Sequence, residues 1–379
     1  MIDNLYPKNP MFKKLGDIAV RNKGTKITAT QMKLLHKSGG AVRIFAGGRT
    51  ISDVDECVIP NKDITKIPGI IVKSRGYIGF EYYDRPFSHK NEFWSYSIPS
   101  ETKHNLKYIY YYLLTLTANL QQVASASFVK IPQICIGDTD RILIPIPPMD
   151  IQQKIASCLT SLDDLITAQE EKINLLKQHK RGLMQQLFPQ PGETIPKLRF
   201  PEFRNTSEWK LTEIDDLLDY EQPGKYQVKS SNYQSTGTPV LTANKSFILG
   251  HTNEKDGIYH HVPVIIFDDF TTDMKYVTFP FKIKSAAIKI LTSSDDYDLR
   301  FLYELMSLIR FDATQHKRYF ISKYRYLKIP TPSKPEQQKI ASCLASIDDL
   351  IAAQEQKVNL LKQHKKGLMQ QLFPNPNLK

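Results

Sequence analysis

A long internal duplication dominates this sequence. Residues 152–189 and 337–374 carry the same amino acid at 32 of 38 positions, with an offset of 185 residues. The segments that lead into them repeat at the same offset, as Ile144-Pro145-Ile146-Pro147 and Ile329-Pro330-Thr331-Pro332. A period of this length is too long for a solenoid repeat. It predicts two copies of one module, each a globular part followed by a helix.

The duplicated segments have the hydrophobic period of a coiled coil. Apolar residues recur at alternating spacings of four and three, which places them along one seam of a helix. The predicted seam residues are Ile155, Leu159, Leu162, Ile166, Ile173, Leu176, Leu183 and Leu187, and then Ile340, Leu344, Ile347, Ile351, Val358, Leu361, Leu368 and Leu372. Gln169 and Lys180 interrupt the first seam, and Gln354 and Lys365 interrupt the second at the equivalent positions. Such polar seam residues lower stability and can fix the register.

The two helices are expected to pair with each other, in opposite directions. After Pro189 the chain has a linker of Pro and polar residues, then the second globular part, and then Pro330 before the second helix. In an antiparallel pair, the end of the first helix lies beside the start of the second. A parallel pair would require the linker to cross the whole length of the helix. The sequence therefore predicts an antiparallel intramolecular coiled coil.

The two globular parts are predicted to be diverged copies of one α+β domain. The segment that starts at Val42 is loosely similar to the one that starts at Pro239, and Pro86-Phe87 is similar to Pro280-Phe281. Short β-branched and aromatic runs predict strands at Ile70–Val72, Tyr77–Tyr83, Val262–Phe267, Tyr276–Ile283 and Ala287–Leu291, and helices are predicted at Leu106–Thr117 and Leu299–Ile309. The predicted organisation is a domain over 1–147, a helix over 148–189, a linker over 190–204, a second domain over 205–332 and a second helix over 333–379.

The charge balance favours a polyanionic partner, either nucleic acid or an anionic membrane surface. The chain has 51 Lys and Arg against 39 Asp and Glu, a formal charge of +12, and most of this excess lies outside the duplicated helices. Basic loop residues neutralise phosphates, and polar side chains read base edges. Any one such residue alone is more often a solvated surface charge, but the set on paired domains favours DNA binding. The candidates are Lys26, Arg43, Arg49, Lys73, Arg75 and Tyr77 in the first domain, and Lys225, Tyr226, Lys229, Lys245, Ser246, Lys275, Tyr276 and Lys284 in the second.

Motifs for catalysis are missing from the sequence. There is no phosphate-binding Gly-x-x-x-x-Gly-Lys-Ser/Thr loop, no Asn/Asp-Pro-Pro-Tyr/Phe motif of adenine methyltransferases and no glycine-rich turn for S-adenosylmethionine. The acidic pairs Asp268-Asp269 and Asp295-Asp296 are predicted to be solvated or capping carboxylates. The four cysteines form no Cys-x-x-Cys pair and are predicted to be buried free thiols, without a metal. The chain is expected to bind rather than to catalyse.

No apolar run approaches the roughly 20 residues that a membrane span requires. The first ten residues lack the basic and then apolar pattern of a secretory signal. We therefore expect a cytoplasmic protein without a membrane partner.

The motifs, taken together, resemble the specificity subunits of type I restriction-modification enzymes. The resemblance rests on two variable domains alternating with two near-identical helices, on the Ile-Pro-x-Pro segments and on the shared ending Leu-Leu-Lys-Gln-His-Lys-(Arg/Lys)-Gly-Leu-Met-Gln-Gln-Leu-Phe-Pro. The linker Pro196-Lys197-Leu198-Arg199-Phe200-Pro201-Glu202-Phe203, followed by Trp209, is also similar to the family. The first domain lacks this linker, and Phe12 is expected to take the place of Trp209.

The resemblance implies a DNA-binding subunit that is not catalytic by itself. Its implied partners are duplex DNA, two methyltransferase (modification) subunits and motor-nuclease (restriction) subunits. S-adenosylmethionine, ATP and Mg would be bound by those partners and not by this chain. Leu165, Leu175, Leu350 and Leu360 lie beside the seam, either as extra core of the helix pair or as a docking surface for partner helices. Two other functions stay open, a single-chain modification enzyme and a coiled-coil adaptor that binds only proteins.

Overall fold

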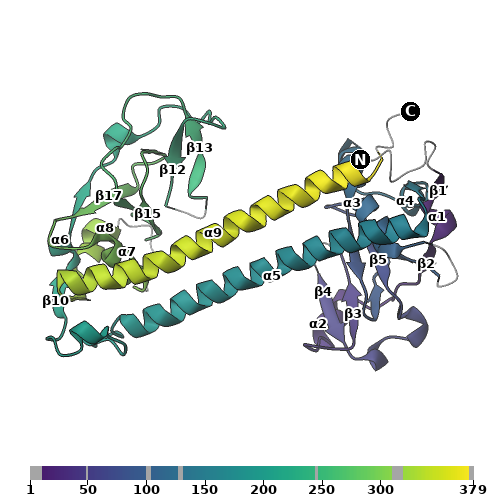
Figure 1. The fold of residues 1–379 in the computed structure, drawn as a ribbon, viewed down its shortest axis with the longest axis horizontal. Helices are drawn as coiled ribbons and strands as arrows, with labels where there is room; N and C mark the ends of the chain where they lie inside the picture. Colours follow the sequence, from purple (N-terminus) through teal and green to yellow (C-terminus); the bar gives the residue numbers. More distant parts are fainter. Residues whose placement is uncertain are drawn as a thin grey trace. The chain divides into compact units, whose positions relative to one another are not determined.

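The computed structural model describes residues 11–47, 50–99, 104–126, 131–243, 246–309 and 319–374. It divides into two compact units: unit 1 contains residues 1–171 and 356–379, and unit 2 contains residues 172–355. The two long helices are α5 (Met149–Leu187) and α9 (Lys334–Leu372). Each of them contributes one half to each unit (Figure 1).

Unit 1 contains a four-stranded sheet in the order β2-β8-β5-β6, a three-stranded sheet in the order β4-β3-β7 and the two-stranded pair β1-β9. The strands are β1 (Phe12–Lys14), β2 (Val20–Asn22), β3 (Val42–Phe45), β4 (Ile51–Val54), β5 (Gly69–Lys73), β6 (Gly79–Tyr83), β7 (Phe87–His89), β8 (Trp94–Ser97) and β9 (Leu143–Pro145). The helices are α1 (Leu15–Ile18), α2 (Ala29–Leu34), α3 (Leu106–Ala126) and α4 (Ile136–Asp140), with 3-10 turns η2 (Glu56–Val58) and η3 (Asn61–Asp63).

Unit 2 repeats this topology strand for strand. Its sheets have the orders β11-β17-β14-β15, β13-β12-β16 and β10-β18. The strands are β10 (Lys210–Glu213), β11 (Leu218–Glu221), β12 (Thr238–Leu241), β13 (Ile248–Thr252), β14 (Val264–Asp268), β15 (Met274–Val277), β16 (Lys282–Ile283), β17 (Ile288–Ser293) and β18 (Lys328–Thr331). The helices are α6 (Ile214–Leu217), α7 (Leu299–Ser307) and α8 (Tyr319–Ser322), with 3-10 turns η4 (Pro201–Phe203), η5 (Gly224–Tyr226) and η6 (Tyr324–Tyr326). The prediction of two pseudo-repeated α+β domains is confirmed.

One predicted strand is wrong. The segment Tyr276–Ile283 forms the end of β15 and all of β16, and these strands belong to different sheets. The chain leaves the four-stranded sheet after Val277 and enters the three-stranded one at Lys282. Pro280 lies in between and has no N–H group to donate to a ladder, so it does not continue a strand.

In unit 1 the beginning of α5 packs antiparallel against the end of α9, side by side in Figure 1. Lys365 Nζ lies 2.5 Å from Asp163 Oδ1, and Lys362 Nζ lies 2.6 Å from Glu170 Oε1. The core of unit 1 joins Leu159 and Phe373 of the helices to Tyr108 and Tyr112 of α3. The helix pair and the domain therefore share one hydrophobic core.

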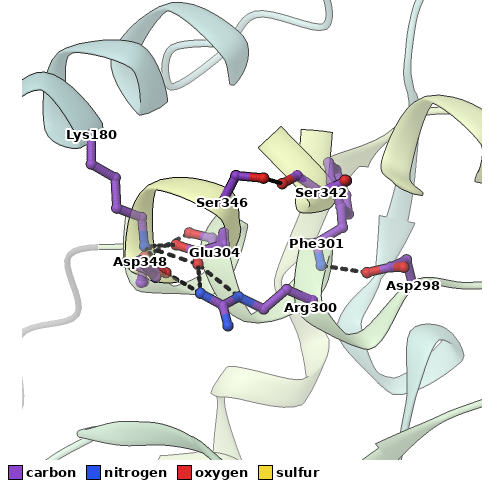
Figure 2. Close-up of polar contacts among 9 residues, drawn as sticks. Lys180, Asp298, Arg300, Phe301, Glu304, Ser342, Ser346 and Asp348 are labelled. Atoms are coloured by element: carbon purple, nitrogen blue, oxygen red, sulfur yellow. Dashed lines mark hydrogen bonds and ion pairs between the residues drawn. The ribbon is translucent and has the colours of Figure 1, made fainter. Parts of the chain in front are cut away.

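In unit 2 the end of α5 packs against the beginning of α9. Lys180 Nζ lies 2.7 Å from Asp348 Oδ2, and Lys177 Nζ lies 2.6 Å from Glu355 Oε1. These pairs and those of unit 1 are related by the 185-residue offset. Lys180 also contacts Glu304 of α7, at 3.0 Å, so that helix and domain meet in one ionic network (Figure 2). All the predicted seam residues are buried or half-buried, and the antiparallel coiled coil is confirmed.

The same glutamine ties each long helix to its domain. Gln152 Oε1 accepts a hydrogen bond from Asn105 N–H at 2.9 Å, and Gln337 Oε1 accepts one from Asp298 N–H at 2.9 Å. Asn105 and Asp298 in turn cap the helices that follow them, α3 and α7. The side chain of Asn105 accepts from Tyr108 N–H, and that of Asp298 accepts from Phe301 N–H. Two diverged domains are thus attached by one duplicated contact.

The strands that precede the long helices, β9 before α5 and β18 before α9, each pair with the first strand of their domain. Phe12 pairs with Pro145, and Leu211 pairs with Pro330. Phe12 therefore corresponds to Leu211, and the expectation that it replaces Trp209 is wrong. Trp209 is 2% exposed, and its Nε1 donates to Glu336 Oε1 at 3.3 Å.

The cysteines differ from the prediction. All four are free, but Cys57, Cys135 and Cys158 are exposed and Cys343 is half-buried. Cys57 lies in a 3-10 turn, Cys135 precedes α4, and Cys158 lies on an outer face of α5, so none of these three is placed to enter a core. Among the helices of the described ranges, none combines the length and the apolar character that crossing a bilayer requires.

Candidate nucleic-acid interface

The structure separates the predicted DNA-binding residues into distinct environments. Arg49 and Lys245 lie outside the described residues. Three of the cations are paired inside their domain, namely Arg43, Lys73 and Lys225. Two of the tyrosines, Tyr226 and Tyr276, are packed against other aromatic rings. Exposed to solvent are Lys26, Arg75, Tyr77, Lys225, Lys229, Ser246 and Lys284, among which Lys225 is also paired with Glu221.

Each paired cation contacts a carboxylate of a neighbouring strand. Arg43 on β3 donates two hydrogen bonds to Asp53 on β4, Nε to Oδ1 at 2.6 Å and the second to Oδ2 at 2.8 Å. These bonds raise the pKa of Arg43 and lower that of Asp53. Lys73 Nζ lies 2.6 Å from Glu81. A cation that is already paired with a carboxylate attracts a phosphate less strongly.

The two packed tyrosines serve the domain core. Tyr226 is 8% exposed, lies 4.8 Å from the ring of Tyr259 and donates its hydroxyl to Glu221 at 3.1 Å. Tyr276 lies beneath the guanidinium of Arg300, at 5.0 Å from its ring centroid. Lys275, its neighbour on β15, is half-buried. Both tyrosines therefore serve packing within the domain.

Arg75 and Tyr77 lie together in the turn between β5 and β6. Gln121 of α3 holds this turn, because its Nε2 donates to Gly76 O at 3.2 Å and its Oε1 accepts from Ile78 N–H at 2.8 Å. Tyr77 is 71% exposed. The equivalent turn of unit 2, between β14 and β15, contains acidic residues and no Lys or Arg.

Lys26 lies at the end of the three-stranded sheet of unit 1 where the parallel strands β3 and β7 terminate. The residue before it, Thr25, donates its N–H to His89 O at the end of β7, at 2.8 Å. Lys90, the residue that follows β7, donates its N–H to Phe45 O at the end of β3, at 2.9 Å. Because β3 and β7 are parallel, Lys26 and Lys90 flank the same end of the sheet.

Unit 2 repeats this arrangement with two lysines. Val228 donates its N–H to Ile283 O at 3.0 Å, and Lys284 donates its N–H to Leu241 O at 3.0 Å. Lys229, the residue after Val228, therefore corresponds to Lys26. Lys284 corresponds to Lys90, which was not among the predicted residues. The similarity of Pro86-Phe87 to Pro280-Phe281 could have identified Lys90, because each lysine follows three residues after its phenylalanine.

The loops that carry these lysines are anchored differently in the two units. In unit 2 Glu254 accepts hydrogen bonds from the N–H groups of Lys229 and Ser230, at 3.0 and 3.3 Å. The buried Lys282, with a side chain 1% exposed, pairs with Glu254 at 3.0 Å and donates to Asp256 O at 2.6 Å. In unit 1 a cleft of about 530 Å³ lies beside Lys26, and Lys23, Lys62 and Asn91 contribute to its lining.

The carboxylates of the acidic pair Asp268-Asp269 contact groups of their own domain. Asp268 Oδ1 accepts from the N–H groups of Phe270 and Thr271, both at 3.0 Å, so this carboxylate caps a turn as predicted. Asp269 is fully buried beside Lys289, with 3.5 Å between their charged atoms, and accepts from Phe320 N–H at 2.8 Å. The prediction of solvated or capping carboxylates therefore holds for Asp268 and is wrong for Asp269. Within the described ranges, no three His, Cys, Asp or Glu side chains gather as a metal would require.

Comparison with known proteins agrees with the repeated topology. The chain matches the family described as "Type I restriction modification DNA specificity domain" over residues 7–178 and again over residues 206–363. It is 48% identical over 133 residues to the type I restriction enzyme EcoR124I/EcoR124II specificity subunit of Escherichia coli, a match that covers only 33% of each protein. It is 24% identical over 273 residues to the type I restriction enzyme MjaVIII specificity subunit of Methanocaldococcus jannaschii, covering 64% of each protein.

A solved structure has a similar fold over nearly the whole chain. The crystal structure of the S subunit of a type I restriction-modification system from M. genitalium has a TM-score of 0.67 and 16% sequence identity, covering 97% of this chain and 96% of that one. The family match extends over both units and into both long helices. The chain therefore belongs to the type I restriction-modification DNA specificity family, whose domain it contains twice.

Proposed function

We propose that this chain is the DNA-reading specificity subunit of a type I restriction-modification complex and recognises a bipartite duplex target through its two α+β domains. The observation that carries the proposal is that unit 2 repeats the strand order of unit 1 while the side chains of the two domains differ. The two long helices, by contrast, are nearly identical. A constant scaffold with two diverged domains suits the reading of two different half-sites.

Within this proposal, the long helices bind two methyltransferase subunits. Leu165 and Leu360 are 40% and 58% exposed in unit 1, and Leu350 and Leu175 are 54% and 64% exposed in unit 2. Apolar side chains that stay in solvent at repeated positions favour a docking surface over extra core of the helix pair. Each unit offers one such leucine from each helix, which suits one copy of the same partner per unit.

The chemistry would then belong to the partners. The methyltransferase subunits would bind S-adenosylmethionine and methylate an adenine in each half-site, after taking the base out of the stack. The motor-nuclease subunits would bind ATP and Mg and cleave unmethylated DNA. The present chain would supply sequence recognition and assembly, without a cofactor of its own, in the cytoplasm.

The alternative is a coiled-coil adaptor that binds only proteins. Lys26 and Lys229, which are exposed at equivalent positions of the two units, favour DNA binding instead. The test is to co-express the chain with the methyltransferase encoded beside it and to map adenine methylation on host DNA by single-molecule sequencing. A single bipartite motif with a fixed gap would support the proposal. A complex that assembles but leaves no motif would favour the adaptor.

A further inference from the structure

We propose that each unit binds the DNA backbone at one end of its three-stranded sheet. This is the end at which the two parallel strands terminate, β3 and β7 in unit 1 and β12 and β16 in unit 2. The phosphate contacts would be Lys26 and Lys90 in unit 1 and Lys229 and Lys284 in unit 2. This inference rests on the proposed function and adds to it the edge of each domain that meets DNA. It also separates residues that position the duplex from those that read bases, because phosphate contacts carry no sequence information.

These lysines are repeated where the two domains otherwise differ. Their equivalence follows from backbone hydrogen bonds, since Thr25 donates to His89 O as Val228 donates to Ile283 O. The segments around them share little sequence. A base-reading residue would be expected to differ between two half-sites, whereas a phosphate contact is required by both.

Most of these lysine charges are available to a phosphate. Among the described residues, no carboxylate lies within ion-pair distance of Lys26, Lys229 or Lys284. Lys284 lies over the ring of Tyr233, at 5.5 Å from its centroid. Lys90 is the exception, because its Nζ lies 3.3 Å from Glu92 Oε1. Exposed cations on loops gain most from phosphate because counterions are released from the DNA.

The loop that carries Lys229 is held in place by contacts within unit 2, without DNA. The pair Lys282–Glu254 is largely buried, and such pairs contribute little net stability because desolvation offsets the attraction. Its visible effect is on Glu254, which fixes the backbone of Lys229 and Ser230. We therefore assign Lys282 and Glu254 as positioning residues. In unit 1 the cleft beside Lys26 has the further cations Lys23 and Lys62 in its lining.

The rival position is the turn that carries Arg75 and Tyr77. Its counterpart in unit 2 begins with the buried Asp268 and Asp269, followed by the exposed Asp273. This turn offers no Lys or Arg to a phosphate and exposes the carboxylate of Asp273, so the position does not suit a phosphate contact in both domains. Arg75 and Tyr77 remain available to unit 1 alone.

The experiment measures binding to a pool of random-sequence duplexes by the full chain, assembled with the co-expressed methyltransferase. Bound duplexes are sequenced, and affinity for the selected duplex is measured between about 50 and 200 mM salt. The variants are Lys26→Ala/Lys229→Ala and Lys90→Ala/Lys284→Ala, each removing one lysine from each unit. The matched control is Lys14→Ala/Lys210→Ala, which removes exposed lysines from the two-stranded pairs β1-β9 and β10-β18.

We expect the Lys26→Ala/Lys229→Ala variant to select the same motif as the unmodified chain. Its affinity should fall on the order of tenfold, and the slope of log affinity against log salt should shrink by about 2, as for two lost phosphate contacts. The control should leave both quantities unchanged. An unchanged slope in both test variants would overturn the inference, even where the motif is selected. Failure of the unmodified chain to select any motif would instead overturn the proposed function.

Discussion

Lys180 on α5 and Asp348 on α9 form an ion pair, with 2.7 Å between Nζ and Oδ2. Lys180 also lies 3.0 Å from Glu304 on α7, and Arg300 contacts both carboxylates (Figure 2). Two cations thus neutralise two acids where the helix pair meets the recognition domain of unit 2. In unit 1 the equivalent Lys365 meets Asp163 and lies over the ring of Tyr111.

Lys180→Met is expected to destabilise unit 2. The side chain of Glu304 is 2% exposed, so that losing one of its two cations leaves a buried carboxylate undercompensated. The free energy of unfolding should fall by about 3 kcal/mol, at the lower end for a broken buried pair because Arg300 remains. Urea unfolding of the full chain measures it.

The matched control is Lys177→Met, one turn earlier on the same helix. Lys177 pairs with Glu355, but both side chains are about half exposed, at 49% and 48%. Its loss should cost less than about 1 kcal/mol, as solvent screens the pair. Equal losses for the two variants would show that burial does not set the strength of these contacts.

Arg199 and Glu336 provide a double-mutant test of the linker. Arg199 donates to both carboxylate oxygens of Glu336, at 2.7 and 2.8 Å, and their side chains are 9% and 1% exposed. Unit 1 has no such linker and carries Ile151 at the position equivalent to Glu336. Arg199→Met should therefore lower the free energy of unfolding by about 3 kcal/mol.

Adding Glu336→Ile to Arg199→Met should restore part of that loss, because it removes the uncompensated buried carboxylate, whereas Trp209 Nε1–H then loses its acceptor. Thermal unfolding of the two single variants and the double variant separates the contributions. Additive losses would mean that the two residues do not act as a pair.

Leu165→Glu/Leu350→Glu tests the docking surface. Both leucines are exposed, so the change should alter the free energy of unfolding by less than about 0.5 kcal/mol. Co-purification with the methyltransferase should nevertheless be lost, because a charge enters an apolar contact. Gln153→Glu/Gln338→Glu, at exposed equivalent positions of the same helices, adds the same charge and should leave assembly intact. Normal assembly by the leucine variant would reject the docking surface.

Asp53 predicts a pH-dependent contribution to stability. The hydrogen bond from Arg43 lowers the pKa of its carboxyl in the folded chain below the ordinary value of 3.8. A lowered folded-state pKa gives a contribution that is present above the ordinary value and is lost as the pH falls through the folded pKa. Asp53→Asn should therefore destabilise the chain at neutral pH, and this difference should shrink below about pH 4 in denaturant unfolding. A difference that is constant with pH would exclude the ion pair as its cause.

The helix pair could be predicted from the sequence because its determinants are local and repeated. A 3.5-residue period is visible along each segment, and chain connectivity alone favours the antiparallel direction. The sequence also identifies Lys180 as a polar residue of the seam, but it does not indicate that Glu304 is its partner. That contact joins residues 124 positions apart.

The site could be predicted only in part, because the environment of a cation depends on distant partners. Lys282 is buried against Glu254, and Lys289 against Asp269, which no local pattern indicates. The sequence predicts Arg43 as a DNA contact, but Asp53 lies directly opposite on the neighbouring strand and accepts its hydrogen bonds. The register of that hairpin, had it been known, would have predicted the pair.

The central claim is that each recognition domain reads its own half-site, and a domain exchange tests it most directly. Residues 12–145 would replace residues 211–330, since Phe12 pairs with Pro145 as Leu211 pairs with Pro330. Methylation would be mapped on host DNA for the original and the exchanged chain, each co-expressed with the methyltransferase. The account predicts that the half-site read by unit 2 is replaced by a second copy of the one read by unit 1, with the gap unchanged. A motif unaltered by the exchange would contradict it.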